Sequence, residues 1–369
     1  MHQYSQGKAT TQGHKGIPEG HFEEEQGRRG FFGQVSHLIK EKPSTRWTQI
    51  QGPLRPHMYD TVPMQEKAGQ WQRLLFNQDV GLYMQKFQPG TLDSLFAYRN
   101  ADGDTLFFCH AGHGEILTEY GMLDYRKGHY ILIPKCVTYQ FLPRSATQLL
   151  VIESKQGSYR EPDRGMVGRN AFYDLAALGK PRLSDQLDYL ATHKECALEI
   201  QVKRLEQITQ FSYKQTYFDT VGWKGDLFPF TLHVDDLMPM LSARVHLPPS
   251  AHTTFVANNF VVCTFLPRPL ETDADALKVP FYHQNIDYDE VLFYHEGAFF
   301  SRDNLHAGMM SFHPAGFPHG PHPKAVLKTP TKTHTNEYAV MIDTWNPLQQ
   351  DPDASKIEIE SYAMSWKTP

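Results

Sequence analysis

Short apolar runs separated by turn residues dominate the chain from about residue 80 onward. In the first half the runs lie at residues 106–108, 116–118 and 130–133, with turn residues such as Asp102-Gly103-Asp104 between them. The same pattern returns after about residue 230, at residues 259–266, 290–294, 309–312 and 338–342. Spacing of about 8–12 residues between turn signals is typical of sandwiches and barrels, so we predict two β units.

Two segments depart from this pattern. Residues 183–190 have apolar side chains at helical spacing, which predicts a helix in the connection between the β units. Residues 1–45 are polar and Gly-rich, with Glu23-Glu24-Glu25 followed by Arg28-Arg29, and favour a solvated or partner-wrapping arm. The expected division is an arm (1–45), a first β domain (46–165), a connecting segment with a helix (166–225) and a second β domain (226–369).

Composition narrows the class of protein. The chain has 369 residues, of which 40% are hydrophobic, so it can bury a large core, and its net charge of −5 argues against a nucleic-acid surface. No stretch approaches the roughly 18 apolar residues of a membrane span, and the N-terminus has no apolar signal core. Four scattered cysteines without a CxxC pair favour a cytoplasmic protein without disulfides.

Histidine is the unusual component, with 19 residues, and neutral imidazole is the commonest metal ligand. The informative block runs from 283 to 319. A hairpin can bring His283 and Glu290 together, and a turn at Gly316 can aim His319 back at them. Two histidines and one carboxylate on one face of an ion are typical of non-haem Fe(II) oxygenases. We therefore predict His283, Glu290 and His319 as ligands of Fe(II).

This block resembles the cupin superfamily. The second cupin motif, G-x5-P-x-G-x2-H, is matched by the residues Gly308, Pro314, Gly316 and His319. The first motif is matched by His283, Glu290 and Gly297, with Asn285 in place of its second histidine. In the first β unit the same spacing gives Gly128 and Pro134, but then Cys136 and Tyr139 in the glycine and histidine positions. The resemblance implies an all-β fold with minor helices and two cupin-like jelly-roll domains, with metal only in the C-terminal one.

Longer segments are similar to homogentisate 1,2-dioxygenases, in order over roughly residues 30–345 and most closely to the shorter microbial branch. The segments that carry the resemblance are Asn100-Ala101-Asp102-Gly103-Asp104, Thr118-Glu119-Tyr120-Gly121, Trp223-Lys224-Gly225-Asp226, Val245-His246-Leu247-Pro248-Pro249-Ser250, Tyr282-His283-Gln284-Asn285 and Pro318-His319-Gly320-Pro321.

The resemblance implies an activity and a site. The activity is the conversion of homogentisate and O₂ to maleylacetoacetate, in tyrosine and phenylalanine breakdown. The resemblance implies that His246 is the catalytic base and that His313 lies in the second shell or contacts substrate. It places His319 beside the substrate, together with Phe281 and Phe299, which stand where relatives carry tyrosine. It also implies a homo-oligomer, a trimer or hexamer, and leaves the roles of His252 and His322 open.

Two other functions remain open from the sequence. Phe281 and Phe299 lack the tyrosine hydroxyls, which favours a related Fe(II) dioxygenase for another hydroquinone acid such as gentisate. The incomplete first motif, with Asn285 in place of a histidine, is also compatible with a metal-binding cupin that has no turnover.

Overall fold

The computed structural model describes residues 4–67, 69–90, 96–193, 195–299, 304–322 and 331–366, and it is mostly β with short helices. All the predicted apolar runs lie in strands. The runs before residue 150 fall in β7 (Asp104–Ala111), β8 (His113–Thr118) and β10 (His129–Ile133). Those after residue 230 fall in β17 (Phe260–Phe265), β19 (Asp289–Ala298), β20 (Met309–His313) and β21 (Asn336–Thr344).

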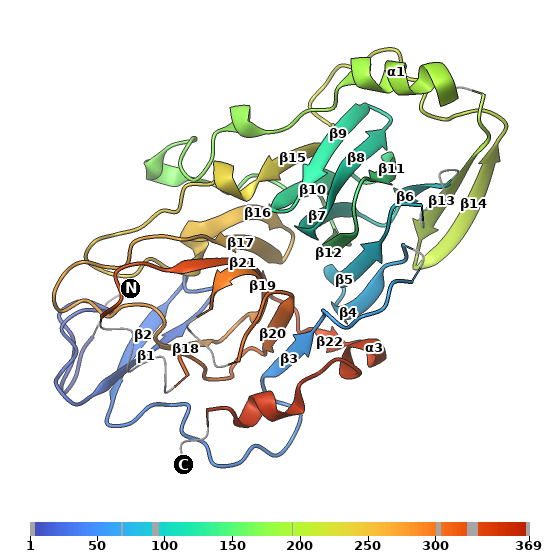
Figure 1. Ribbon diagram of the computed structural model, residues 1–369. Helices are drawn as coiled ribbons and strands as arrows, with labels where there is room; N and C mark the ends of the chain where they lie inside the picture. Colours follow the sequence, from blue (N-terminus) through green and yellow to red (C-terminus); the bar gives the residue numbers. More distant parts are fainter. Residues whose placement is uncertain are drawn as a thin grey trace.

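Four sheets organise the described chain (Figure 1). The central sheet has the order β15 (Phe230–His233), β10, β7, β12 (Thr147–Ser154), β5 (Val80–Phe87), β4 (Gln72–Phe76), β22 (Gln349–Gln350). The outer sheet has the order β14 (Gln207–Tyr213), β13 (Leu198–Arg204), β6 (Phe96–Asn100), β11 (Thr138–Pro143), β8, β9 (Gly121–Arg126). The C-terminal sheet has the order β16 (Thr253–Ala257), β17, β21, β19, β20, β3 (His57–Asp60). The arm sheet has the order β18 (Tyr282–Asn285), β1 (Phe22–Gly27), β2 (Val35–Lys40).

The central sheet is buried on both faces. On β7, Phe107 and Cys109 pack against the outer sheet, whereas Leu106 and Phe108 pack in the core shared with the C-terminal sheet. Successive side chains of a strand point to opposite faces, so a strand covered on both sides is apolar at every position. This explains why the run at 104–109 is continuous rather than alternating.

Several strands cross the predicted domain boundaries. β3 comes from the predicted first domain but pairs with β20 of the C-terminal sheet. β15 and β22 come from the predicted second domain but join the central sheet. β13 and β14, from the connecting segment, extend the outer sheet. The division into domains therefore stays a prediction, and the strand pairing interlocks the two halves.

The helices are short and lie at the periphery. The predicted connecting helix is α1 (Leu183–His193), and its Leu190 packs beside Leu117 and Met122 of the outer sheet. The others are η1 (Gly165–Val167), η2 (Leu175–Ala177), η3 (Val234–Asp236), η4 (Pro249–His252), α3 (Pro352–Ser355) and η6 (Glu360–Met364). None of the described helices has the length and apolar character needed to cross a bilayer.

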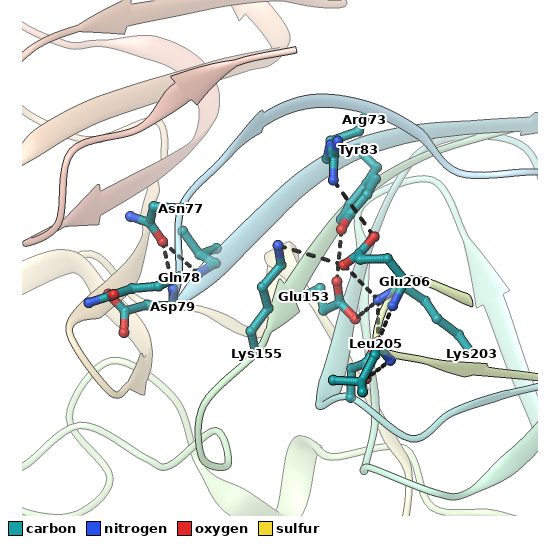
Figure 2. Close-up of polar contacts among 12 residues, drawn as sticks. Arg73, Asn77, Gln78, Asp79, Tyr83, Glu153, Lys155, Lys203, Leu205 and Glu206 are labelled. Carbon is teal, nitrogen blue, oxygen red and sulfur yellow. Dashed lines mark hydrogen bonds and ion pairs between the residues drawn. The ribbon is translucent and has the colours of Figure 1, made fainter. Parts of the chain in front are cut away.

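A buried ion-pair network attaches the β13–β14 hairpin to the central sheet (Figure 2). Lys203 Nζ lies 2.7 Å from Glu153 Oε1 and 2.8 Å from Asp102 Oδ2. The hydroxyl of Tyr83 donates to the other oxygen of Glu153 at 2.8 Å. Because Glu153 is fully buried, these contacts are needed to offset the cost of removing its charge from water.

The part of the predicted solvated arm that contains the charge run forms paired strands instead, which corrects the sequence-based interpretation of residues 22–40. β1 pairs in parallel with β18 and antiparallel with β2. The three glutamates Glu23, Glu24 and Glu25 are 3%, 2% and 8% exposed. Each has a basic partner in the fold, such as Lys40 at 2.6 Å from Glu24 and His37 at 2.6 Å from Glu23. The run of glutamates predicted a solvent-exposed segment because their partners are distant in sequence or, for histidine, carry no formal charge.

A histidine pair between the central and C-terminal sheets, one buried and one partly buried, predicts acid sensitivity. His110 of β7 and His295 of β19 are joined Nδ1 to Nδ1 at 3.0 Å, which requires one ring to donate and the other to accept. Burial is the main cause that lowers the pKa of His110 to about 4 and that of His295 to about 3. The unfolded chain therefore binds more protons below about pH 6.5, and stability falls as pH drops toward 4, by up to about 1.4 kcal/mol per pH unit for each histidine.

Denaturant unfolding between pH 4 and 7 measures this effect. A His110→Gln, His295→Gln double variant should show a shallower fall than the parent, whereas His306→Gln, at an exposed histidine, should not. Parallel curves for the parent and the double variant would contradict the assignment.

Candidate metal centre

The three predicted metal ligands meet between the C-terminal sheet and the arm sheet. His283 lies on β18, Glu290 near the start of β19, and His319 in the loop after β20. His283 and His319 exchange backbone hydrogen bonds, N to O, at 2.8 and 2.9 Å. Candidate ligand atoms of the three side chains all lie within 4.8 Å of one another, as the sequence predicted.

Local backbone geometry explains why these segments converge. On β19, Val291 and Phe293 face the shared core, so Glu290 points to the opposite face, toward the arm sheet. After β20 the chain turns at Gly316, whose φ of +77° favours glycine, and the Gly316 N–H donates to the carbonyl of Asn285. This turn carries His319 back beside His283.

The first β unit has the same backbone at the corresponding motif positions. Gly128 and Gly308 have φ of +89° and +90°, and Cys136 has φ of +66° where the second unit has Gly316. Tyr139, in the histidine position, is buried in the aromatic core between the central and outer sheets. A phenol held in such a core offers no imidazole nitrogen to an ion.

The hydrogen bonds of the two histidines aim their Nε2 lone pairs at the centre of the cluster. His283 Nδ1 lies 3.0 Å from the carbonyl of Phe281, and His319 Nδ1 lies 2.9 Å from the carbonyl of Phe317. A carbonyl only accepts, so each Nδ1 carries the proton and each Nε2 is free of one. His319 Nε2 is buried and has no hydrogen-bond partner, although it is 3.4 Å from Glu290 Oε1.

This donor set fits a divalent transition-metal ion. Imidazole nitrogens and a carboxylate suit iron, and the carbonyl contacts supply the supporting hydrogen bonds that ligating histidines need. Glu290 and His319 are nearly buried, whereas the His283 side chain is 20% exposed, so the open side of the cluster lies toward His283.

Electrostatics keep Glu290 ionised. Burial alone would raise its pKa, but the neighbouring imidazoles of His319, His283 and His313 hold the pKa well below its usual range. Burial and the neighbouring His283 lower the pKa of His319, which favours the neutral ligand form. The cluster thus combines an ionised Glu290 with a neutral His319.

His313 lies behind Glu290. It sits directly across from Glu290 in the β19–β20 ladder, with Nδ1 3.1 Å from Glu290 Oε1 and Nε2 3.0 Å from the hydroxyl of Tyr362. Its ring also stacks on that of His319 at 4.4 Å. His313 therefore contacts both candidate ligands. Its predicted supporting role or contact with substrate stays a prediction.

His246 and Phe281 adjoin the cluster. The ring of Phe281 lies 5.6 Å from that of His283 and 5.1 Å from that of His246. His246 Nδ1 is 3.4 Å from Glu271 Oε1, and burial is the main cause that lowers the pKa of His246. A neutral imidazole held by a carboxylate is the state that a catalytic base requires.

The other predicted residues lie farther out. Phe299 packs on the ring of Tyr294 in an apolar cluster that also contains Trp366, and its role toward substrate stays a prediction. His252 is buried beside Phe265, with its Nδ1 lacking a hydrogen-bond partner. His322 Nε2 lies 2.6 Å from the carbonyl of Ser365, which assigns it a structural contact at the C-terminal segment.

Two residues near the ligands were missed from the sequence. Phe31, from the arm, packs on His283 at a ring distance of 5.5 Å. The apolar pair at 31–32 within a polar arm was the available signal. Asp343 of β21 lies directly across from Glu290, and burial and the charges of Glu290 and Asp289 raise its pKa well above the usual range. Asp343 lies near the C-terminal end of the buried strand β21, and no sequence motif marks this position.

The protonated state of Asp343 gives a testable prediction. A neutral carboxylic acid resembles an amide in size and polarity, so Asp343→Asn should keep activity and iron content within about threefold of the parent. Metal analysis and steady-state rates measure this. A loss of more than about tenfold would mean that the Asp343 carboxylate acts in its charged form or exchanges its proton.

The arrangement defines a mostly β protein with a buried two-histidine, one-carboxylate centre, and comparisons with known proteins assign its family. The family described as "Homogentisate 1,2-dioxygenase N-terminal" matches residues 29–234, more than half of the chain. A protein of Saccharolobus solfataricus, provisionally named a dioxygenase, is 31% identical over 368 residues, covering 94% of this chain and 93% of its own length. This chain belongs to the homogentisate 1,2-dioxygenase family.

Similarity to other proteins is more distant. Homogentisate 1,2-dioxygenase of Bradyrhizobium diazoefficiens is 24% identical over 73% of this chain, and the match spans 62% of the relative's length. Among solved structures, a cupin 2 conserved barrel domain protein from Leptotrichia buccalis aligns over 77% of this chain and 92% of its own, with 11% identity and a TM-score of 0.35.

Proposed function

We propose that the protein is a non-haem Fe(II) dioxygenase that converts homogentisate and O₂ to maleylacetoacetate. The observation that carries the proposal is the buried cluster of His283, Glu290 and His319, with both Nε2 lone pairs aimed at one point. Family membership supports the reaction class, and the names of the relatives support the substrate.

The chain's own residues supply binding, orientation and proton transfer. Fe(II), when bound by these three side chains, supplies a Lewis-acidic centre with open positions for O₂ and a ring hydroxyl. His313 holds the Glu290 carboxylate from behind, so that the ligand geometry is fixed before substrate arrives. Neutral His246 accepts a proton from a ring hydroxyl, and Glu271 stabilises the imidazolium that results.

Apolar rings shape the space between base and ligands. Phe281 is 8% exposed and lies between His246 and His283. Phe31 packs on His283 as well. These rings exclude water from the side of the cluster where His283 is accessible. They offer no hydroxyl to a substrate, so discrimination there depends on shape.

Oxygen consumption tests the proposal directly. Protein loaded with Fe(II) without air and then given homogentisate in air should consume one O₂ per ring and form maleylacetoacetate. Absence of O₂ uptake with every 2,5-dihydroxyaryl acid would contradict the proposal and favour a metal-binding protein without turnover.

Phe281 is the specific observation behind a second candidate. Its ring contacts both His246 and His283 where relatives carry a hydroxyl, and a missing hydrogen bond to substrate can change selectivity strongly. The kcat/KM values for homogentisate and for gentisate decide which of the two is the substrate. A preference for gentisate of about tenfold, or about 1.4 kcal/mol, would replace homogentisate as the assigned substrate.

We also propose that the chain forms a homo-oligomer, a trimer or a hexamer, on the basis of the family resemblance alone. Sedimentation of a monomer at micromolar concentration would contradict this.

A further inference from the structure

The N-terminal arm carries a second cluster of histidines and carboxylates. Candidate ligand atoms of His14, Glu23 and His37 lie within 4.8 Å of one another. Across the described residues, only this group and the His283–Glu290–His319 group have this arrangement. His14 is 6% and Glu23 3% exposed, so the cluster is not a solvated charge patch.

The strand geometry of the arm builds this cluster. On β1, Glu23 and Glu25 share one face, whereas Glu24 points to the other and pairs with Lys40. The β1–β2 ladder places His37 directly opposite Glu25. Gly13 lets the loop pass over His37, because a Cβ at this position would lie 2.5 Å from His37 Nε2.

The two carboxylates face different nitrogens of the two rings. The Nδ1 atoms of His14 and His37 lie 3.4 and 2.6 Å from the oxygens of Glu23. The Nε2 atoms of the same rings lie 3.2 and 4.0 Å from the oxygens of Glu25. Ligating histidines characteristically direct the second ring nitrogen to a carboxylate, which is the relation of both rings to Glu25.

The unsatisfied atoms point to a missing partner. Nδ1 of His14 and Nδ1 of His37 are both buried, and neither makes a hydrogen bond of regular geometry to the Glu23 carboxylate beside it. Two ligands bound at about 2.1 Å from one ion lie about 3.0–3.4 Å apart at octahedral or tetrahedral angles. The distance of 3.4 Å from His14 Nδ1 to Glu23 falls in this range, and the distance of 2.6 Å from His37 Nδ1 to Glu23 is shorter. The His37 side chain is 21% exposed, which leaves a route from solvent.

The alternative is an ion-pair cluster without metal. Burial alone would lower the pKa of His14, but Glu23 and Glu25 raise it to about 9, and the two histidines in turn lower the pKa of Glu23 to about 2. With His14 as the only imidazolium, the two carboxylates keep a net negative charge in a buried place. A divalent cation with two neutral histidines balances both carboxylates.

We propose that His14, Glu23 and His37 bind a second divalent metal ion such as Zn²⁺. In this arrangement the Glu25 carboxylate orients both histidines through their Nε2–H groups. The ion fixes the arm against the catalytic centre. His14 packs on Phe281 at a ring distance of 4.4 Å and lies 6.1 Å from the ring of His246. The second ion thus supports a wall of the substrate space and takes no part in oxygen chemistry.

Metal stoichiometry tests the proposal independently of turnover. Apoprotein saturated with Zn²⁺ and then desalted should hold two equivalents in the parent, one in His37→Gln, one in His319→Gln and none in the double variant. His21→Gln is the matched control, since His21 lies in the same arm and its ring bonds to the carbonyl of Glu19, outside the cluster, and it should keep two equivalents. Two equivalents in His37→Gln, or none in His319→Gln, would overturn the proposal.

A second measurement covers the case in which His37→Gln perturbs the fold. In the His319→Gln protein, Co²⁺ should give a visible ligand-field absorption from the arm site alone, and the isosteric Glu23→Gln change should remove it. Limited proteolysis should cut the arm faster after chelation in the His319→Gln protein, but not in the variant that also carries Glu23→Gln. Absence of Co²⁺ absorption in folded His319→Gln protein would show an ion-pair cluster and overturn the proposal.

Discussion

Replacing Glu290 by glutamine should abolish iron binding and lower kcat/KM by about 10³-fold or more, since loss of a residue that only supports a ligand already costs about 10–100-fold. Glu290 is the anionic donor, and the three surrounding histidines stabilise its charge. Glutamine keeps the shape but removes the charge, so the cluster can no longer neutralise a divalent ion. Iron content after anaerobic loading and the rate of O₂ consumption measure the effect.

His313→Gln provides a graded comparison for this prediction. His313 contacts Glu290 at 3.1 Å and is placed behind the ligands, so its loss should lower iron affinity by about 10–100-fold without abolishing it. Iron retained at the parental level in Glu290→Gln would contradict the assignment of the centre. Equal losses in the two variants would place His313 among the ligands.

His246→Gln should lower kcat by about 10²–10⁴-fold while leaving iron content and KM nearly unchanged, because a general base acts in the transition state and holds no metal. Burial lowers the pKa of His246, so the parent should lose activity only as pH falls below about 6.5, where the imidazole becomes protonated. The variant should lack this acid limb.

Steady-state rates from pH 5 to 8 test the role of His246. His193→Gln, at an exposed histidine of α1, is the matched control and should reproduce the parental profile. A decrease of less than about threefold in kcat for His246→Gln would exclude the role of catalytic base.

The convergence of the three candidate metal ligands was predictable because each one is set by a short local pattern. Gly316 lies three residues before His319 and produces the turn that orients it, and β-strand alternation fixes the face on which Glu290 lies. The backbone hydrogen bonds between His283 and His319 close the distance between the two motifs. The helix at 183–193 was predictable for the same reason, since its apolar spacing is local.

Residues that depend on distant partners were not predictable. Asp343 is a neutral acid only because the β19–β21 register sets it across from Glu290. Phe31 covers His283 because β1 pairs in parallel with β18, which lies more than 250 residues later. The same pairing converts the run at Glu23–Glu25 from an expected solvated segment into a buried cluster.

The sequence by itself determined the mostly β fold, the three candidate metal ligands and the position of the connecting helix, because hydrophobic alternation, turn residues and ligand spacing are encoded within a few residues of one another. Only the tertiary structure decided the partners of each ionisable group. Burial and neighbouring charges set the protonation state of each ionisable side chain, and the residues that supply them lie on strands that are distant in the chain. The second histidine cluster, the neutral Asp343 and the interlocked sheets all follow from that long-range pairing.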